Sequence, residues 1–305
     1  MTDPQRTRSR CSEGRPAQRM LLLAKKGKHL GYVATKRSVS VAKEAQTRAT
    51  SALWQDYNQK NPYEYHPGMY RRTFLNWDAS PSDGFVPDTR RIFVIWADDT
   101  PLPPVRKRGL DALIDIQKGI QIELITPANI QKWIVPQHPL HPAFRNLSSV
   151  HKSDYLRAYL LHHHGGGYSD VKAPLHHWGP AYRHLEQGDH WVLGYPERST
   201  QWVAQLPRQL GRDLRRYYAR VPGGSAYIAR ADTTLTREWL AEVERRLDYL
   251  APLLEQNPGG VRNEVSAYPV SWNDLLAKIV HPLALKHHRM VNLRTELLPD
   301  LKSYR

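Results

Sequence analysis

The stretch that decides the fold is SSVHKSDYLRAYLLHHHGGGYSDVKAP, residues 148–174. Apolar side chains recur at helical spacing in its first half, which predicts a helix. The core-facing side of this helix is predicted to carry Leu156, Tyr159, Leu160 and His163. The glycines at 165–167 are expected to end the helix, because glycine adopts the left-handed conformation of a helix C-terminus without steric cost. The chain then turns into residues 168–172, which we interpret as the end of a strand.

Four charged side chains flank this turn. Asp154 and Arg157 are three residues apart and share a second face of the predicted helix. Asp170 and Lys172 are two residues apart at the strand end, so their side chains are expected to point the same way. An Asp/Arg pair on a helix is, by itself, most often a solvated ion pair, and three glycines are usually only a turn. The conjunction of both pairs around one turn favours a functional site. We expect the two pairs to converge on a single cleft beside the carboxyl end of the first predicted strand.

The surrounding sequence predicts an α/β fold with a mostly parallel sheet, since strands and helices alternate along it. Strands are expected at residues 91–97, 120–125, 191–195 and 224–229, and helices at 104–117, 127–134 and 235–255. We expect one domain over residues 91–305. A Pro/Tyr-rich connector at 61–90 and a basic extension at 1–60, helical from about residue 38, precede it.

Positive charge is concentrated near the N-terminus. The chain has 44 Lys and Arg against 29 Asp and Glu, a net charge of +15, and +9 of this lies in residues 1–50. We interpret that arm as a solvated tail; contact with anionic lipid or acidic glycan, and a targeting peptide, are the alternatives. The remaining residues have a nearly ordinary charge balance, so nucleic acid is not an expected partner.

Several classes of protein are disfavoured by what the sequence lacks. A single cysteine, Cys11, excludes a disulfide framework and a multi-cysteine metal site. Apolar runs such as residues 20–24 are far shorter than the roughly 20 residues that cross a bilayer, so we expect a cytoplasmic protein, with peripheral membrane contact through the arm as an option. Motifs of P-loop kinases, Rossmann dehydrogenases, zincins and α/β-hydrolases are missing.

The histidine runs are not expected to bind metal. Consecutive helical residues diverge by about 100°, so His162, His163 and His164 cannot converge on one ion. The pairs at 176–177 and 287–288 are expected to be solvated.

The central pattern resembles that of glycosyltransferases with a DXD sugar-binding region, similar to glycosyltransferase family 32. That group includes initiating mannosyltransferases and capsular polysaccharide synthesis proteins. The resemblance rests on Ser153-Asp154 with Arg157, the three glycines, Tyr168, and Asp170-Val171-Lys172. Residues 92–96 resemble the opening strand of the family, and residues 268–272 with His281-Pro282 resemble a C-terminal element of its capsule-synthesis members.

The resemblance implies a GT-A fold and retaining transfer of a hexose from a nucleotide-diphosphate sugar to a glycan or cell-surface polysaccharide acceptor. Asp154 and Arg157 would then bind the hexose hydroxyls, Asp170 the ribose or the metal-bound diphosphate, and Trp96 the base. The candidate catalytic residues are Asp170 and Lys172. The candidate substrate-binding residues are Asp154, Arg157, Trp96, Tyr168 and Trp272, and the candidate metal ligands are Asp170 and His281.

Lys172 departs from the family pattern, which has a second acid there to bind Mn²⁺ or Mg²⁺. Three interpretations follow. Lys172 replaces the metal as a fixed positive charge; or a metal still binds through Asp170, the diphosphate and a histidine such as His281 or His176; or the site is inactive. In the last case the protein would be a GT-A binding module that recognises anionic glycan or nucleic acid through its basic arm.

Overall fold

The computed structural model describes residues 46, 49–54, 56–261 and 266–301. The chain divides into two compact units, Met1–Ala52 and Leu53–Arg305. Within the predicted N-terminal helix, residues 49–54 and 56–60 are helical; most of the basic arm lies outside the described residues. The features below all belong to the second unit.

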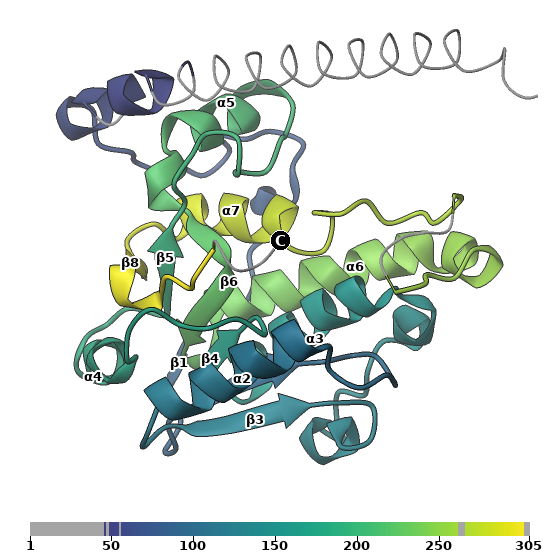
Figure 1. The fold of residues 1–305 in the computed structure, drawn as a ribbon. Helices are drawn as coiled ribbons and strands as arrows, with labels where there is room; N and C mark the ends of the chain where they lie inside the picture. Colours follow the sequence, from purple (N-terminus) through teal and green to yellow (C-terminus); the bar gives the residue numbers. More distant parts are fainter. Residues whose placement is uncertain (1–45, 47–48, 55, 262–265, 302–305) are drawn as a thin grey trace, which may run out of the picture. The chain divides into compact units, whose positions relative to one another are not determined.

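The central sheet has six strands (Figure 1). Their spatial order is β3 (Gln121–Ile125), β2 (Arg91–Ile95), β4 (Gly166–Ser169), β6 (Pro222–Ala229), β5 (Val192–Pro196) and β8 (Val291–Leu293). β2 is parallel to β3 and β4, and β5 is parallel to β8, whereas β6 is antiparallel to both of its neighbours. Five strands therefore end at one edge of the sheet. The prediction of a mostly parallel sheet is confirmed, with β6 as the exception.

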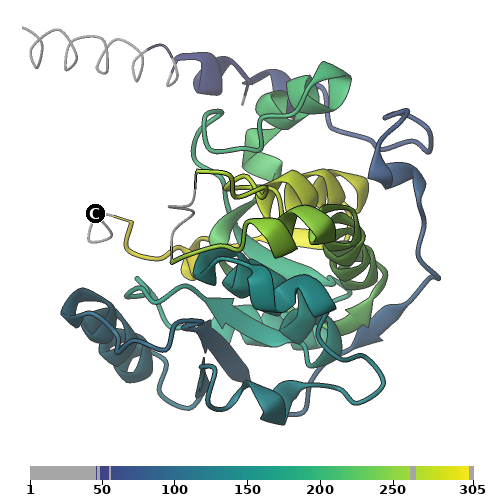
Figure 2. The same cartoon turned by 90° about the vertical axis from the view of Figure 1, so that its right-hand side faces the viewer.

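Helices cover both faces of this sheet, as Figures 1 and 2 show from two directions. They are α2 (Pro104–Ile116), α3 (Ser149–His163), α4 (Gly179–Gln187), α6 (Thr234–Gln256) and α7 (Ala277–Lys286). A further helix, α5 (Arg208–Arg216), packs on α7 instead. Side chains of alternate residues in β2 point to opposite faces of the sheet. Phe93 and Ile95 pack with α3, α6 and α7, whereas Ile92 and Val94 pack with α2 and α4. Within the described ranges, no helix is long and apolar enough to cross a bilayer.

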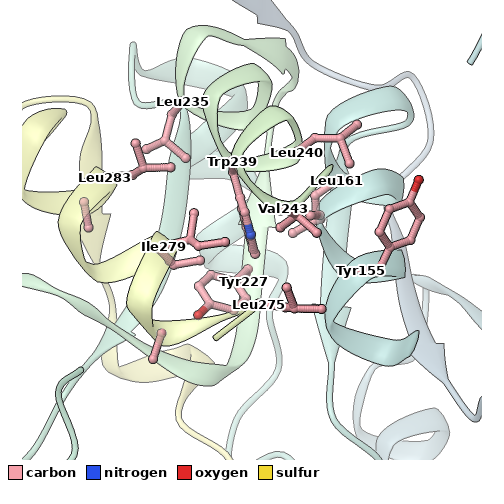
Figure 3. Packing of buried hydrophobic residues seen from close by; sticks show 14 of the residues in the cluster. Tyr155, Leu161, Tyr227, Leu235, Trp239, Leu240, Val243, Leu275, Ile279 and Leu283 are labelled. Carbon is pink, nitrogen blue, oxygen red and sulfur yellow. The ribbon is translucent and has the colours of Figure 1, made fainter. Parts of the chain in front are cut away.

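Trp239 of α6 lies at the centre of the larger core cluster (Figure 3). Its ring meets that of Tyr227 on β6 edge-on, with ring centroids 5.7 Å apart. Ile279 of α7 and Leu161 of α3 flank this pair. In this cluster α3 and α6 pack against each other and against the sheet, so α3 has little room to shift against β4 and β6.

The short elements include one correction. The predicted helix at 127–134 is wrong: residues Ile130–Trp133 form a 3-10 turn, η2. The Asn129 side chain bonds both to the N–H of Thr126 and to the carbonyl of Leu124, each at 2.8 Å, and these local bonds compete with an α-helical start. The other short elements are β1 (Asp83–Phe85), paired antiparallel with β7 (Ala231–Thr233), and the turns η1 (Phe74–Asn76), η3 (Pro142–Asn146), η4 (Tyr218–Arg220) and η5 (Thr295–Leu297).

Candidate active site

A glycine turn joins α3 directly to β4. Gly165 and Gly166 have φ values of +59° and +86°, so the predicted left-handed helix end is confirmed. A Cβ atom on Gly165 would lie 2.7 Å from the backbone nitrogen of Ala231, which leaves no space for a larger residue. The turn therefore holds the carboxyl end of α3 against the sheet and starts β4 at once.

The predicted second face of α3 is buried rather than solvated. Asp154 and Arg157 are each 4% exposed, because this face of α3 lies against β4 and β6, to which Arg157 is hydrogen-bonded. This burial excludes the solvated surface pair that the spacing alone would suggest. A buried ion pair stabilises a fold only when hydrogen bonds satisfy its remaining polar atoms, so the partners of both residues matter.

The four charged side chains meet at one place. Nη2 of Arg157 lies 3.4 Å from Oδ1 of Asp154 and 3.6 Å from Oδ1 of Asp170. Nζ of Lys172 lies 2.9 Å from Oδ2 of Asp170. The predicted convergence of the helix pair and the turn pair is thus confirmed.

Two details of that prediction are wrong. β4 ends at Ser169, and the N–H of Lys172 donates to the carbonyl of Asp170 at 2.7 Å. Such an i to i+2 bond marks a tight turn rather than a strand, and this turn folds the Lys172 ammonium back onto Asp170. Moreover, the four side chains form a buried cluster and not the open cleft that we expected, because only Asp170, with its side chain 21% exposed, reaches the surface.

Tyr168 connects the two pairs. Its hydroxyl accepts a hydrogen bond from Nη2 of Arg157 at 2.7 Å and donates one to Oδ1 of Asp170 at 2.8 Å. The guanidinium carbon of Arg157 also lies 4.0 Å from the centre of the Tyr168 ring. The hydroxyl therefore fixes the distance between the Arg157 guanidinium and the Asp170 carboxylate.

The antiparallel strand β6 completes the cluster. The carbonyl of Gly224 accepts from Nη1 of Arg157 at 2.7 Å. Ser225 contributes twice: its hydroxyl accepts from Nζ of Lys172 and its carbonyl accepts from the N–H of Asp170, each at 2.8 Å. Sequence reasoning missed both β6 residues, because the strand lies more than fifty positions away along the chain.

The two acids have different proton affinities. Burial alone would raise the pKa of Asp170, but Lys172 and Arg157 outweigh it and hold that pKa below its ordinary value. Burial raises the pKa of Asp154 to about 7, with Arg157 acting against the rise and Asp170 adding to it. Asp170 is therefore a carboxylate near neutral pH, whereas Asp154 is divided between its two forms.

The predicted metal ligands, Asp170 and His281, are poorly placed to bind Mn²⁺ or Mg²⁺. These ions need several hard oxygen ligands, yet the oxygens of Asp170 face the Tyr168 hydroxyl and the Lys172 ammonium. His281 is 1% exposed, its Nδ1 accepts from the N–H of Ala204 at 3.0 Å, and burial lowers its pKa to about 4 despite a backbone hydrogen bond to Pro222. Both sides of its ring are thus engaged away from Asp170. In the described part of the chain, no three His, Cys, Asp or Glu side chains gather as metal ligands.

The histidine run at the end of α3 diverges as predicted. His162 contacts the hydroxyl of Thr236, His163 contacts His138, and His164 bonds to the carbonyl of Trp133. His176 and His177 are exposed, as expected.

The prediction for residues 287–288 is wrong. The His287 and His288 side chains are 12% and 10% exposed, because the chain after α7 turns back toward α6. There His287 lies 2.8 Å from the buried Glu238 carboxylate.

The two predicted tryptophans lie apart from the charged contacts. Trp96 directly follows β2 and is half-buried, and its Nε1 donates to the carbonyl of Thr100 at 2.7 Å. Trp272 is 58% exposed. The segment before Trp272 is tied to the start of α3, where the fully buried His151 bonds to Ser271 and stacks on Tyr268.

Glu197 is a site candidate that sequence reasoning missed. It directly follows β5, and hence lies at the sheet edge where Trp96 follows β2 and Asp170 follows β4. Glu197 is 7% exposed, burial raises its pKa to about 7, and its Oε2 has no hydrogen-bond partner among the described residues. The signal was available, because Glu197 comes two residues after the predicted strand 191–195, and acids that follow parallel strands share one edge.

Residues 45–173 match the model of a protein family described as capsular polysaccharide synthesis protein. The match includes Trp96, Tyr168 and all four charged residues, and it ends before Trp272 and His281. The chain matches none of the curated proteins. The matched residues include the part that builds the charged cluster, and the match is compatible with a role in capsular polysaccharide synthesis.

Proposed function

We propose that the chain is a GT-A glycosyltransferase that transfers a hexose, with retention, from a nucleotide-diphosphate sugar to a glycan or cell-surface polysaccharide. One observation carries this proposal: the helix pair and the turn pair meet within 4.0 Å at the edge where the parallel strands end. Ligands of open α/β sheets bind at this edge. The capsule-synthesis match supports the same class of chemistry.

Exposure distinguishes the roles of the four residues. Asp170 is the one that reaches the surface, so we assign it the contact with the donor. Lys172 lies beside it and supplies positive charge for the diphosphate. Arg157 and Asp154 are nearly fully buried, which favours positioning of Asp170 over the direct contact with hexose hydroxyls that the resemblance implies. Trp96, at the same edge, is assigned to the base.

In the proposed reaction, the bond between the anomeric carbon and the diphosphate oxygen breaks, and its electron pair stays on that oxygen. The acceptor hydroxyl oxygen bonds to the anomeric carbon on the same face, and its proton passes to the departing phosphate. Negative charge grows on the leaving group, where a fixed cation is most effective. Lys172 is the cation that we assign to this task.

We propose further that the reaction does not require a divalent cation, because the Lys172 ammonium occupies the place of the second acid. We also assign the reaction to the cytoplasmic side of the membrane, where nucleotide sugars are made.

The test is nucleotide release from UDP-, GDP- and dTDP-hexoses by the full chain, with Mn²⁺ or with a chelator. We expect turnover of at least one donor in chelator. Asp170→Asn should lower it by about 100- to 1000-fold, the usual effect of removing one preorganised electrostatic group. The matched control is Asp111→Asn, an exposed acid on α2, which should retain full activity.

Two outcomes would overturn parts of the proposal. No release from any donor, or full activity in Asp170→Asn, would remove the transferase assignment and favour the glycan-binding module. Chelator-sensitive activity that persists in Lys172→Ala would leave the transferase but remove the role assigned to Lys172.

A further inference from the structure

A cavity of about 840 Å³ lies between residues 68–74 and the first turn of α5, with one side chain each from α6 and α7. We call it the arginine cavity. It is lined by six basic residues and by no acid: Arg71, Arg72, Arg208, Arg212, Arg246 and Lys278. None of these belongs to the charged cluster described above.

Two of the six cations are neutralised within the protein. Nε of Arg246 lies 2.7 Å from the Glu242 carboxylate, and Nζ of Lys278 lies 2.5 Å from Asp274. The other four form no ion pair with any residue of the described ranges: Arg71, Arg72, Arg208 and Arg212. Four such charges around one cavity create a strongly positive electrostatic potential there. A bound anion would reduce the repulsion between them.

The backbone around the cavity adds to this potential. α5 begins at Arg208, and its first turn has neither a capping side chain nor an acid. The first N–H groups of a helix carry partial positive charge. Arg72 and Arg208 also have φ values of +58° and +60°, two of the three such values at non-glycine positions of the described chain. Residues in this uncommon conformation cluster at ligand sites.

The rest of the lining is suited to an organic group. Tyr70, Phe74 and Met69 supply apolar surface beside the cations. A volume of about 840 Å³ lies in the range of small-molecule pockets and exceeds what one phosphate needs. The guanidinium fork matches phosphate oxygens in pairs and stays protonated at all physiological pH values.

We propose that the arginine cavity binds a diphosphate group carried by a larger organic molecule. The inference does not depend on the proposed transferase reaction, because it concerns a different set of residues. Two sources share this chemistry: a free phosphorylated molecule and a phosphorylated lipid headgroup.

The first test is calorimetric binding of inorganic pyrophosphate to the full chain. We expect Arg208→Gln with Arg212→Gln to weaken binding at least tenfold. The control is Arg145→Gln with Arg183→Gln, exposed residues on η3 and α4, which removes the same charge elsewhere and should change the affinity less than twofold. Lys172→Ala separates the two anion sites, because the pyrophosphate binding that is lost in the Arg208/Arg212 double variant should remain in it.

Three results would overturn the proposal: no binding to the unaltered chain, equal losses in both double variants, or loss in Lys172→Ala alone, which would assign the anion to the charged cluster. Hydrogen exchange of the unaltered chain gives a second measurement if the variant fails to fold. Pyrophosphate should slow exchange in peptides that cover residues 68–74 and 206–212, and exchange that is unchanged there contradicts the proposal.

Vesicles distinguish the two sources. In one arm, the chain is sedimented with vesicles that contain phosphatidic acid. If sedimentation is lost in the Arg208/Arg212 double variant but retained in the control, the ligand of the arginine cavity is a lipid headgroup. Pyrophosphate binding without vesicle binding would assign a free molecule. Vesicle binding that survives in both double variants, with no pyrophosphate binding, would assign the contact to the basic arm and overturn the cavity.

Discussion

The molecule handles charge in two opposite ways. In the cluster at the end of β4, two cations face two carboxyl groups within 4.0 Å, and Tyr168 and β6 satisfy the remaining bonds. In the arginine cavity, four exposed cations have no acidic partner among the described residues. The first arrangement is balanced internally and fixes geometry, whereas the second is balanced only by something that binds. Each of the following predictions tests that difference.

The largest effect on stability is expected from Arg157→Met. Removing one member of a buried ion pair leaves the other charge without compensation, which costs about 3–5 kcal/mol. Denaturant unfolding should show this loss, whereas Arg208→Met should change the free energy of unfolding by less than about 0.5 kcal/mol. Similar small losses in both variants would contradict the contrast between the two regions.

The next effect concerns Asp154 and pH. Because its pKa is raised from 3.8 to about 7 in the folded protein, the folded state keeps a proton between those values that the unfolded state releases. The contribution of Asp154 to stability therefore falls as the pH rises through this window. Relative to the unaltered chain, Asp154→Asn should gain about 4 kcal/mol between pH 4 and pH 8. Asp111→Asn serves as the control, and a gain that is independent of pH would refute the explanation.

Glu197 should show a conflict between stability and activity. Its carboxyl is buried with a pKa raised to about 7, so ionisation above that pH opposes folding. Glu197→Gln should stabilise the protein at pH 8 by roughly 3 kcal/mol and, as a change in the candidate site, lower donor turnover. A more stable variant with full turnover would remove Glu197 from the candidate site.

The smallest effect is expected in the arginine cavity. Without ligand, Arg208→Gln with Arg212→Gln should stabilise the protein by at most about 0.5 kcal/mol, since mutual repulsion is relieved. The gain should fade at high ionic strength because salt screens exposed charges. Thermal melts at 20 mM and 500 mM salt, where the screening lengths are roughly 20 and 4 Å, would measure the gain. A clear destabilisation would mean that these arginines are structural.

Local signals made half of this structure predictable. The strands at β2 and β3 and the helices α2, α3 and α6 have clear apolar patterns, and the glycines after α3 mark its end. The charged residues converge within a stretch of nineteen positions, from Asp154 to Lys172, so a helix, a turn and a short strand suffice to bring them together.

The features that the sequence did not predict depend on contacts between segments that are far apart along the chain. Ser225 reaches the cluster only because β6 inserts between β4 and β5, and the cavity gathers arginines from segments more than a hundred residues apart. α5 has glycine at position 211 and charges throughout, and α7 contains Pro282, so neither shows a clean helical pattern. The burial of Asp154 and Arg157 likewise depends on β6, where the carbonyl of Gly224 accepts a hydrogen bond from Arg157.

The antiparallel strand β6 determines when the charged cluster can form during synthesis. During synthesis, Lys172 leaves the ribosome 53 residues before Ser225, and Arg157 leaves it 67 residues before Gly224. Until then both cations lack acceptors that the finished protein gives them. The charged cluster is therefore completed only when the last internal strand of the sheet is in place, so its geometry depends on a strand that is synthesised after all four of its charged residues.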